Sequence, residues 1–192
     1  MKKLNKLEQY MSLVLEWNKT HNLISKNQEP KLDEHVQDSL SIIPHLGRVV
    51  VDLGSGGGLP GIPIAIKEPK KRIILVESNQ KKAAFLLNTT NKLNLTNVRV
   101  INGRIEELDL KKLPSAYDIV TRAVGTIEHT IKLTHKHLDK KEVKLKLMKT
   151  ADQINKESVP QNYTIKKILK IPTKGKDKSR ILVTIEKEKH NG

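Results

Sequence analysis

The stretch 49-VVVDLGSGGGLPGIPIAI-66 decides the fold of this chain, because five glycines stand within eight residues between an apolar run and the expected start of a helix. Glycine lets the backbone turn sharply after a strand and lets a ligand approach without a Cβ in the way. Three classes of ligand use such a loop: a dinucleotide, a nucleoside triphosphate, and a nucleoside without phosphates such as S-adenosylmethionine. The neighbouring residues choose among them.

The residues around this glycine loop (residues 54–61) argue against a nucleoside triphosphate. No Gly-Lys-Ser/Thr sequence follows the glycines, so the phosphates would have no lysine partner. A dinucleotide remains open, because the spacing G-x-G-x-x-G is present at Gly56, Gly58 and Gly61 beside the spacing G-x-G-x-G that begins at Gly54.

The register of the loop favours the nucleoside without phosphates. A turn that begins at Gly54 puts Asp52 at the carboxyl end of the strand, whereas one that begins at Gly56 starts too late for a tight turn. A carboxylate there suits the amino group and sulfonium of S-adenosylmethionine and would repel a pyrophosphate. Pro60 and Pro63 fit the first turn of a helix and leave it fewer free N–H groups for phosphates.

The rest of the chain predicts one α/β domain. Residues 4–17 and 33–40 have the pattern of amphipathic helices. After them, strands are expected at 48–53, 73–77, 97–101, 117–122 and 143–148, and helices at 60–67, 80–93 and 126–138. This alternation implies a mostly parallel sheet with helices on both faces. The last two strands, 163–171 and 181–187, are joined by only nine residues and should form an antiparallel hairpin.

Composition bounds the partners and the compartment. The 192 residues carry a net charge of +15, which makes a polyanion such as nucleic acid a plausible partner, although lysine-rich solvated faces would give the same charge. Cysteine is absent, which excludes disulfides and thiol chemistry and favours a reducing cytoplasm. No run of 18 apolar residues is present, and the N-terminus lacks the uninterrupted apolar core of a signal peptide.

Acidic residues stand at the ends of the second and third expected strands. Glu77 lies 23 residues after Gly54, where a carboxylate can accept hydrogen bonds from both ribose hydroxyls. NAD and S-adenosylmethionine share the ribose, so Glu77 does not separate them. The third strand leads into 102-NGRIEEL-108, whose carboxylates and backbone could bind an adenine edge; a charged helix N-terminus explains Glu106 equally well.

Taken together, these residues resemble one family. The loop DLGSGGGLPGIP, preceded by 17-WNKTHNLIS-25 and 35-HVQDSL-40 and followed by 104-RIEEL-108 and 121-TRAVG-125, is similar to the RsmG (GidB) family of small-subunit ribosomal RNA methyltransferases. The resemblance covers nearly the whole chain in the same order. It implies a class I S-adenosylmethionine-dependent methyltransferase with a Rossmann-like sheet, which methylates guanine N7 in 16S rRNA near the decoding region.

The resemblance also implies site residues. Gly54 and Leu59 match the family's cofactor loop, Ile105 and Glu106 its adenine-side pair, and Arg122 its arginine after the fourth strand. With the loop argument above, the candidate cofactor-binding residues are Asp52, Gly54, Ser55, Gly56, Gly58, Leu59, Glu77, Ile105, Glu106 and Arg122. Arg104 and Arg122 are expected to position the substrate, and Arg104 and Lys149 to bind RNA. Thr150 stands where the family often has glycine.

The chemistry implied by the resemblance agrees with what the sequence lacks. Guanine N7 carries an in-plane lone pair and no proton, so its methylation needs positioning and no general base. No Asn-Pro-Pro-Tyr type motif, catalytic cysteine or His/Asp pair is evident. The histidines lack metal-ligand spacing, and His21, His35 and His45 are expected to be surface or capping groups.

These interpretations give one set of expectations. Residues 1–46 should form a helical segment packed on a methyltransferase core of residues 47–192. The partner should be 16S rRNA or the small ribosomal subunit, with no metal and no membrane, for a cytoplasmic monomer. Two rival functions remain: an NAD-dependent Rossmann oxidoreductase, and a basic RNA-binding assembly factor that is not an enzyme.

Overall fold

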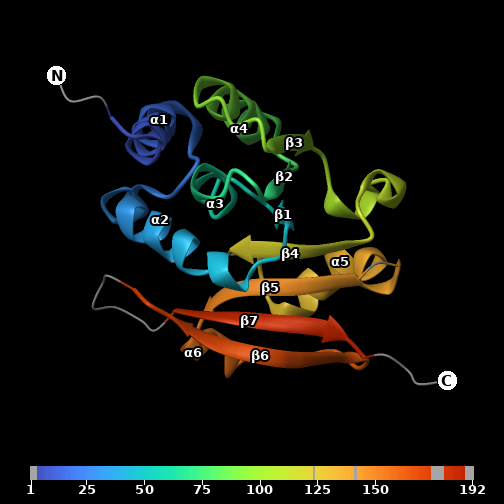
Figure 1. Ribbon diagram of the computed structural model, residues 1–192. Coiled ribbons are helices and arrows are strands. Elements are labelled where there is room, and N and C mark those ends of the chain that lie inside the picture. Colours follow the sequence, from blue (N-terminus) through green and yellow to red (C-terminus); the bar gives the residue numbers. More distant parts are fainter. Residues whose placement is uncertain (1–3, 123, 141, 174–179, 189–192) are drawn as a thin grey trace.

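In the described part of the chain, seven strands form one sheet at the centre of the molecule (Figure 1). The structure is a computed structural model that describes residues 4–122, 124–140, 142–173 and 180–188. The strands are β1 (Val49–Leu53), β2 (Arg72–Glu77), β3 (Val98–Asn102), β4 (Ala116–Arg122), β5 (Glu142–Thr150), β6 (Tyr163–Ile171) and β7 (Arg180–Lys187). Their order across the sheet is β3-β2-β1-β4-β5-β7-β6.

The pairing of the strands confirms the predicted architecture. β1, β2, β3, β4 and β5 run parallel to one another, while β7 is antiparallel to both β5 and β6. The last strand of the chain therefore lies inside the sheet and β6 forms the edge, an order that the sequence did not predict. Residues 174–179 of the expected hairpin connection lie outside the described residues.

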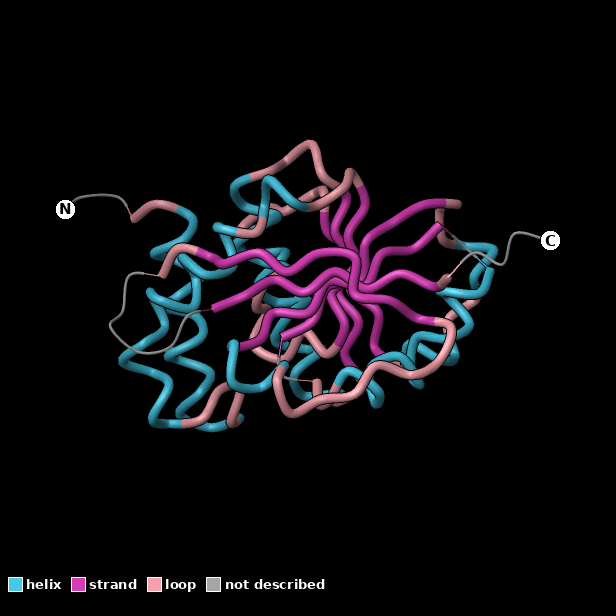
Figure 2. The backbone as a smooth tube through the Cα atoms, turned by 90° about the horizontal axis from the view of Figure 1, so that it is seen from below, coloured by secondary structure: helices cyan, strands magenta, loops and turns pink. Residues whose placement is uncertain are grey.

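The helices cover both faces of the sheet, as Figure 2 shows from below. The α-helices are α1 (Lys6–His21), α2 (Leu32–Ser41), α3 (Gly61–Lys67), α4 (Gln80–Lys92), α5 (Ile127–Lys140) and α6 (Ala151–Ile154). Short 3₁₀ helices are η1 (Lys26–Lys31), η2 (Ile43–His45), η3 (Ile105–Glu107) and η4 (Leu110–Lys112). One apolar core lies between one face of the sheet and the helices α1, α2, α3 and α4. A second core lies between the other face of the sheet and α5.

The N-terminal residues pack into the first of these cores. Tyr10 and Val14 of α1 are fully buried, and α1 contacts α3 and α4. Asn5 caps α1 by accepting hydrogen bonds from Leu7 N and Glu8 N, while the Glu8 carboxylate accepts from Asn5 N, which completes a capping box. The helix ends at Asn22, whose φ of 35° is left-handed. This packing brings α1 to the carboxyl edge of the sheet, where the glycine loop lies.

The strand register gathers the expected site residues at that edge. Leu53 is level with Val76 and Thr121, and Glu77 is level with Asn102, so the loops after β1, β2, β3 and β4 lie on the same side of the sheet. Ligands of open α/β sheets bind in the crevice outside these carboxyl ends. The fold thus places the glycine loop, Glu77, Arg104 and Arg122 at the same edge of the sheet.

Candidate functional site at the carboxyl edge of the sheet

The glycine loop leaves β1 in a conformation that suits glycine. Gly54 has φ of 67°, Gly56 of 54° and Gly58 of 94°, values that residues with a Cβ rarely adopt. The Gly54 and Ser55 N–H groups both bond Val76 O of β2, at 2.9 and 3.2 Å, which ties the start of the loop to the neighbouring strand. A Cβ on Gly54 would lie 2.8 Å from Val124 Cγ2, whereas one on Gly56 would meet only Gly54 O, at 3.8 Å.

Asp52 lies beneath the loop. Its side chain is fully buried, and Oδ2 accepts a hydrogen bond of 2.9 Å from Gly61 N at the start of α3. Ser55, also buried, donates from Oγ to Asp52 O at 2.9 Å. Burial raises the pKa of the Asp52 carboxyl to about 7, against the opposing effect of the Gly61 hydrogen bond. Asp52 and Ser55 therefore shape the loop from within, and a direct contact of Asp52 with a cationic ligand has no support in this geometry.

Glu77 faces the same loop from the end of β2. Its Oε2 accepts a hydrogen bond of 2.8 Å from Gly56 N, and its Oε1 accepts one of 2.8 Å from Asn79 N, just before α4. Glu77 as a whole is 7% exposed, and each carboxylate oxygen keeps a further lone pair. Glu77 thus has a structural role in the loop and can still accept from a ligand hydroxyl.

The segment after β3, here called the 102–108 loop, is tied to Glu77. Gly103 N donates to Glu77 O at 3.0 Å, and the Asn102 side chain donates to the same oxygen at 2.9 Å. Ile105 is 1% exposed and packs in the core beneath α5, while Glu106 is partly exposed. The side chain of Ile105 is therefore unavailable to a ligand, and the backbone of the 102–108 loop is the part that can reach one.

A cavity of about 420 Å³ opens beside the glycine loop. Small-molecule sites commonly have volumes of about 300 to 1,000 Å³. The cavity is lined by Leu23, Ile24, Ser25, Gln28, His35, Gly54, Ser55, Gly56, Gly57, Leu59, Lys82 and Arg122. The N-terminal segment forms one wall, and the Tyr10 hydroxyl fixes that wall to the loop by donating to Gly57 O at 2.8 Å. Sequence reasoning identified the glycine side of this cavity but not the wall built from residues 23–35.

Arg122 and His35 meet in that wall. The guanidinium Nη2 of Arg122 donates to His35 Nδ1 at 2.7 Å, and His35 Nε2 contacts Gln28 Oε1 at 2.5 Å. A guanidinium can only donate, so Nδ1 is the acceptor and Nε2 carries the proton. Burial, and then the charge of Arg122, lower the pKa of His35 to about 4. The expectation that His35 is a surface or capping group is wrong: it is buried, neutral and holds Arg122.

Lys149 does not face the crevice as an RNA contact. Its side chain is buried, and its ammonium donates to Glu157 Oε1 at 2.7 Å and to Gly125 O at 2.9 Å. The other carboxylate oxygen of Glu157 accepts from Ile127 N at the start of α5. A phosphate could reach Lys149 only by displacing this ion pair, which argues against the expected contact of Lys149 with RNA. Arg104, in contrast, is exposed at the start of η3.

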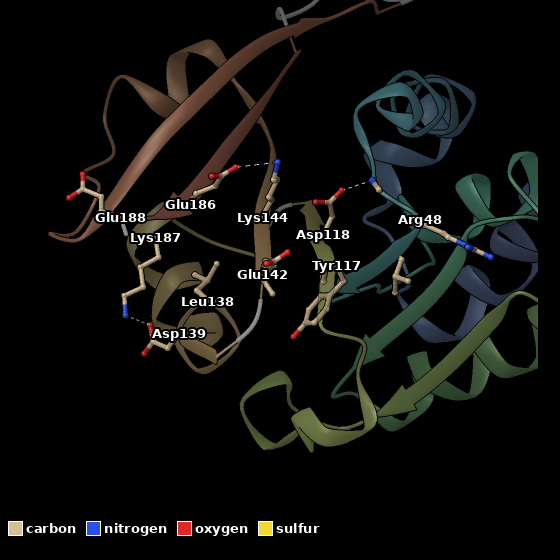
Figure 3. Close-up of a pocket in the computed structure, with 14 residues that line it drawn as sticks. Arg48, Tyr117, Asp118, Leu138, Asp139, Glu142, Lys144, Glu186, Lys187 and Glu188 are labelled. Atoms are coloured by element: carbon tan, nitrogen blue, oxygen red, sulfur yellow. Dashed lines mark hydrogen bonds and ion pairs between the residues drawn. The ribbon is translucent and has the colours of Figure 1, made fainter. Parts of the chain in front are cut away.

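A larger cavity, of about 970 Å³, lies away from the glycine loop at the amino ends of β1, β4 and β5 (Figure 3). Its charged side chains are largely satisfied within the protein. Lys144 pairs with Glu186 at 3.5 Å, Lys187 pairs with Asp139 at 2.8 Å, and Asp118 accepts from Gly47 N at 2.6 Å. Because none of the sequence-predicted site residues lines it, the glycine-loop cavity remains the candidate site.

The residues of the glycine-loop cavity fit a nucleoside ligand with an amino-acid tail. Gly56 lines the cavity without a Cβ, and Glu77, which accepts from Gly56 N, has lone pairs left for a ligand hydroxyl. Among the described residues, no group of three or more His, Asp or Glu side chains could hold a metal ion. The described residues also contain no helix that is long and apolar enough to cross a membrane.

Comparisons with known proteins extend this assignment. A family model described as "rRNA small subunit methyltransferase G" (GidB) matches residues 3–183. A protein of that name from Nitrosomonas eutropha is 35% identical over 187 residues, which cover 94% of this chain and 86% of the relative. One from Nitrosomonas europaea is 45% identical over 136 residues, 70% of this chain and 62% of the relative.

The fold is shared with a wider group of methyltransferases. An O-methyltransferase from Bacillus cereus, solved in complex with S-adenosylhomocysteine, superposes with a TM-score of 0.63 at 14% identity and covers 93% of this chain and 91% of its own. At that identity the likeness shows the fold alone. The family match over nearly the whole sequence goes further: the chain belongs to the rRNA small subunit methyltransferase G (GidB) family.

Proposed function

We propose that this protein transfers a methyl group from S-adenosylmethionine to N7 of a guanine in 16S rRNA, near the decoding region. Membership of the family supports S-adenosylmethionine-dependent methylation of rRNA. The proposal adds the target atom, guanine N7, and its location near the decoding region. The observation that carries the proposal is the crevice at the carboxyl edge of the sheet. There the glycine loop lines a cavity of about 420 Å³, the Glu77 carboxylate accepts from Gly56 N of that loop, and Gly103 N of the 102–108 loop donates to Glu77 O.

The protein's contribution to the reaction is positioning. When bound, S-adenosylmethionine supplies an electrophilic methyl group on a sulfonium. Glu77 accepts from the ribose hydroxyls, the 102–108 loop binds the adenine, and the glycine loop with Leu59 receives the methionine part. Arg122, the last residue of β4, lines the cavity. Its hydrogen bond to His35 fixes the position of its guanidinium. In-line approach within about 3 Å accounts for much of the acceleration of such a transfer.

The state of His35 agrees with a reaction that needs no base. His35 is the histidine among the residues that line this cavity, and both of its ring nitrogens are engaged, one by Arg122 and the other by Gln28. Its pKa of about 4 reflects this burial, and an acceptor that is already bonded cannot take a proton from a substrate. Guanine N7 has no proton to remove, so the chemistry and the site match.

The RNA substrate is proposed to approach over Arg104, which is exposed beside the 102–108 loop. The net charge of +15 supports a polyanionic partner. We propose that the protein acts as a cytoplasmic monomer on 16S rRNA or on the small ribosomal subunit.

The decisive experiment maps methylated guanines in 16S rRNA by mass spectrometry in cells with and without this gene. One N7-methylguanine should disappear without the gene and return with the wild-type gene but not with the Gly56→Val variant. An unchanged modification pattern would refute the rRNA assignment. Thermal protection of the purified protein by S-adenosylhomocysteine but not by NAD separates the proposal from a Rossmann oxidoreductase.

A further inference from the structure

Two residues of helix α5 form hydrogen bonds to backbone carbonyls of the 102–108 loop. His137, on α5, is 1% exposed, and its Nε2 lies 2.9 Å from Ile105 O. The preceding residue, Lys136, donates from Nζ to Glu106 O at 3.2 Å. Two successive carbonyls of the loop are thus bound by two successive residues of one helix, although 32 residues separate His137 from Ile105.

The other nitrogen of the His137 ring is fixed by β4. The Tyr117 hydroxyl lies 2.6 Å from His137 Nδ1, and the two rings meet edge to face with centroids 6.1 Å apart. Because Ile105 O can only accept, Nε2 must carry a proton and donate. Burial lowers the pKa of His137, which favours the neutral ring, so Nδ1 is free to accept from the Tyr117 hydroxyl. The chain of hydrogen bonds therefore runs from Tyr117 through His137 to Ile105.

This chain fixes the orientation of one peptide group. In a trans peptide the C=O of one residue and the N–H of the next point in opposite directions. His137 holds the Ile105 C=O toward α5, so the Glu106 N–H points away from α5. As the second residue of η3, Glu106 also has an N–H without an acceptor inside its own helix. The 102–108 loop, which follows β3 at the carboxyl edge of the sheet, thus carries an N–H donor without an intrahelical partner.

We propose that His137 is a positioning residue that makes the site specific for adenine, by holding the Ile105–Glu106 peptide so that its N–H meets the base. The inference rests on the proposed function and goes further, because it names the residue that sets which base is accepted. Adenine N1 is an acceptor and its 6-amino group a donor, which complement the Glu106 N–H and carboxylate. Hypoxanthine has N–H at position 1 and a carbonyl at position 6, so both contacts become repulsive.

Two amide variants test the two ring nitrogens of His137 separately. In His137→Gln the side-chain amide can still donate to Ile105 O from about the position of Nε2. In His137→Asn the amide lies near Nδ1, where it can serve Tyr117 but cannot reach Ile105. His135→Asn is the matched control, because His135 is exposed on the same helix and its ring hydrogen-bonds Lys132 O of its own turn.

The measurement is the ratio of dissociation constants for S-inosylhomocysteine and S-adenosylhomocysteine, by calorimetry on the full-length protein. Wild type, His135→Asn and His137→Gln should prefer the adenine ligand by more than about a hundredfold, since a mismatched hydrogen-bonding site discriminates strongly. In His137→Asn the ratio should fall by about tenfold, the effect of one lost hydrogen bond. A partly unfolded sample lowers the number of binding sites but leaves this ratio unchanged.

Each outcome bears on a different claim. A wild-type ratio near one would refute the adenine assignment within the proposed function, whatever the variants do. A wild-type preference that persists in His137→Asn would overturn the role of His137 alone. If His137→Asn does not fold, Tyr117→Phe tests the same chain. Ile105 O still keeps the proton on Nε2, so ¹⁵N NMR spectra should show an unchanged tautomer, but without the hydroxyl the ring loses its second anchor and the ratio should fall. An unaltered ratio in Tyr117→Phe would refute the proposal.

Discussion

The Glu77 carboxylate accepts a hydrogen bond of 2.8 Å from the Gly56 N–H, although the two residues are 21 positions apart. The acid at the end of β2 therefore holds the glycine loop that follows β1. Its second oxygen accepts from Asn79 N, so both oxygens already serve backbone donors. The residue proposed to bind the ribose is also the one that sets the position of the loop beside it.

This double role predicts that Glu77→Gln is not a conservative change. An amide has one acceptor and one donor group, so either Gly56 N or Asn79 N would face an NH₂ group. We expect weaker cofactor binding by about 1.5 to 3 kcal/mol, the range for a hydrogen bond to a charged group. Calorimetry with S-adenosylhomocysteine measures this loss. Equal wild-type affinity for the cofactor and its 2′-deoxyribose analogue would contradict the ribose contact.

Gly56→Val should abolish cofactor binding while the protein stays folded. The backbone φ of 54° is unfavourable for a β-branched residue, and the side chain would project into the cavity, where only Gly54 O lies within 4 Å of the added Cβ. Gly47→Ala is the matched control, because Gly47 lies before β1 at the opposite end of the sheet and its Cβ would come no nearer than 3.4 Å, to Asp118 Oδ2. Circular dichroism and calorimetry on both variants distinguish loss of binding from loss of fold. Unchanged binding by Gly56→Val would refute the loop assignment.

Asp52 should make stability depend on pH. Its pKa is raised from 3.8 to about 7 in the folded protein, so between these values the native state holds a proton that the unfolded state has released. The free energy of unfolding should therefore decrease as pH rises from about 4 to about 7. Asp52→Asn keeps an acceptor for Gly61 N and removes this titration. Urea unfolding across that range should show a shallower pH dependence in the variant; identical curves would show that Asp52 does not carry the proton.

The buried ion pair of Lys149 and Glu157 predicts a stability defect. Lys149→Met would leave the Glu157 carboxylate buried without its cation, a change that typically costs about 3 to 5 kcal/mol. The double variant Lys149→Met, Glu157→Gln should recover part of that loss, because the buried charge is gone. Chemical unfolding measures both. If Lys149→Met instead left stability unchanged and weakened RNA binding, the original RNA assignment would be restored.

The secondary structure was largely predictable because its signals are local. Strand β6 was predicted with the bounds that the structure has, since an apolar and β-branched run is flanked by asparagine and proline. The placement of β7 between β5 and β6 was not, because hydrophobic alternation gives the existence of a strand but not its neighbour. Helix α1 extends beyond the predicted 4–17 to His21, as the apolar stripe ends before the helix does.

The site was predictable only where the backbone itself carries the signal. Glycines and strand-end acids are visible in sequence, but His35 and His137 were misplaced or missed because their partners lie far along the chain. Arg122 is 87 residues from His35, and Tyr117 is 20 residues from His137. Whether a histidine is a surface group or a buried positioning group depends on such distant contacts, for which a single sequence contains no periodic signal.

The final prediction concerns the lysines and arginines, whose excess gives the charge of +15. If that charge serves RNA, each neutralised phosphate releases counterions, and the logarithm of RNA affinity should fall linearly with the logarithm of salt concentration by about 0.7 per contact on single strands. We expect a slope of magnitude about 3 or more, which corresponds to at least about four phosphate contacts. Cofactor affinity should change far less over the same salt range.

Variants on the two ends of the sheet locate these contacts. Arg104, exposed at the carboxyl edge, should supply one, so Arg104→Ala should lower the slope by about 0.7. Lys92, exposed at the C-terminal end of α4, lies toward the opposite edge, and Lys92→Ala should leave the slope unchanged. Fluorescence anisotropy with a 16S rRNA fragment measures all three slopes. A flat salt dependence, or an Arg104→Ala variant with an unaltered slope and full methylation, would show that RNA approaches the protein from another face.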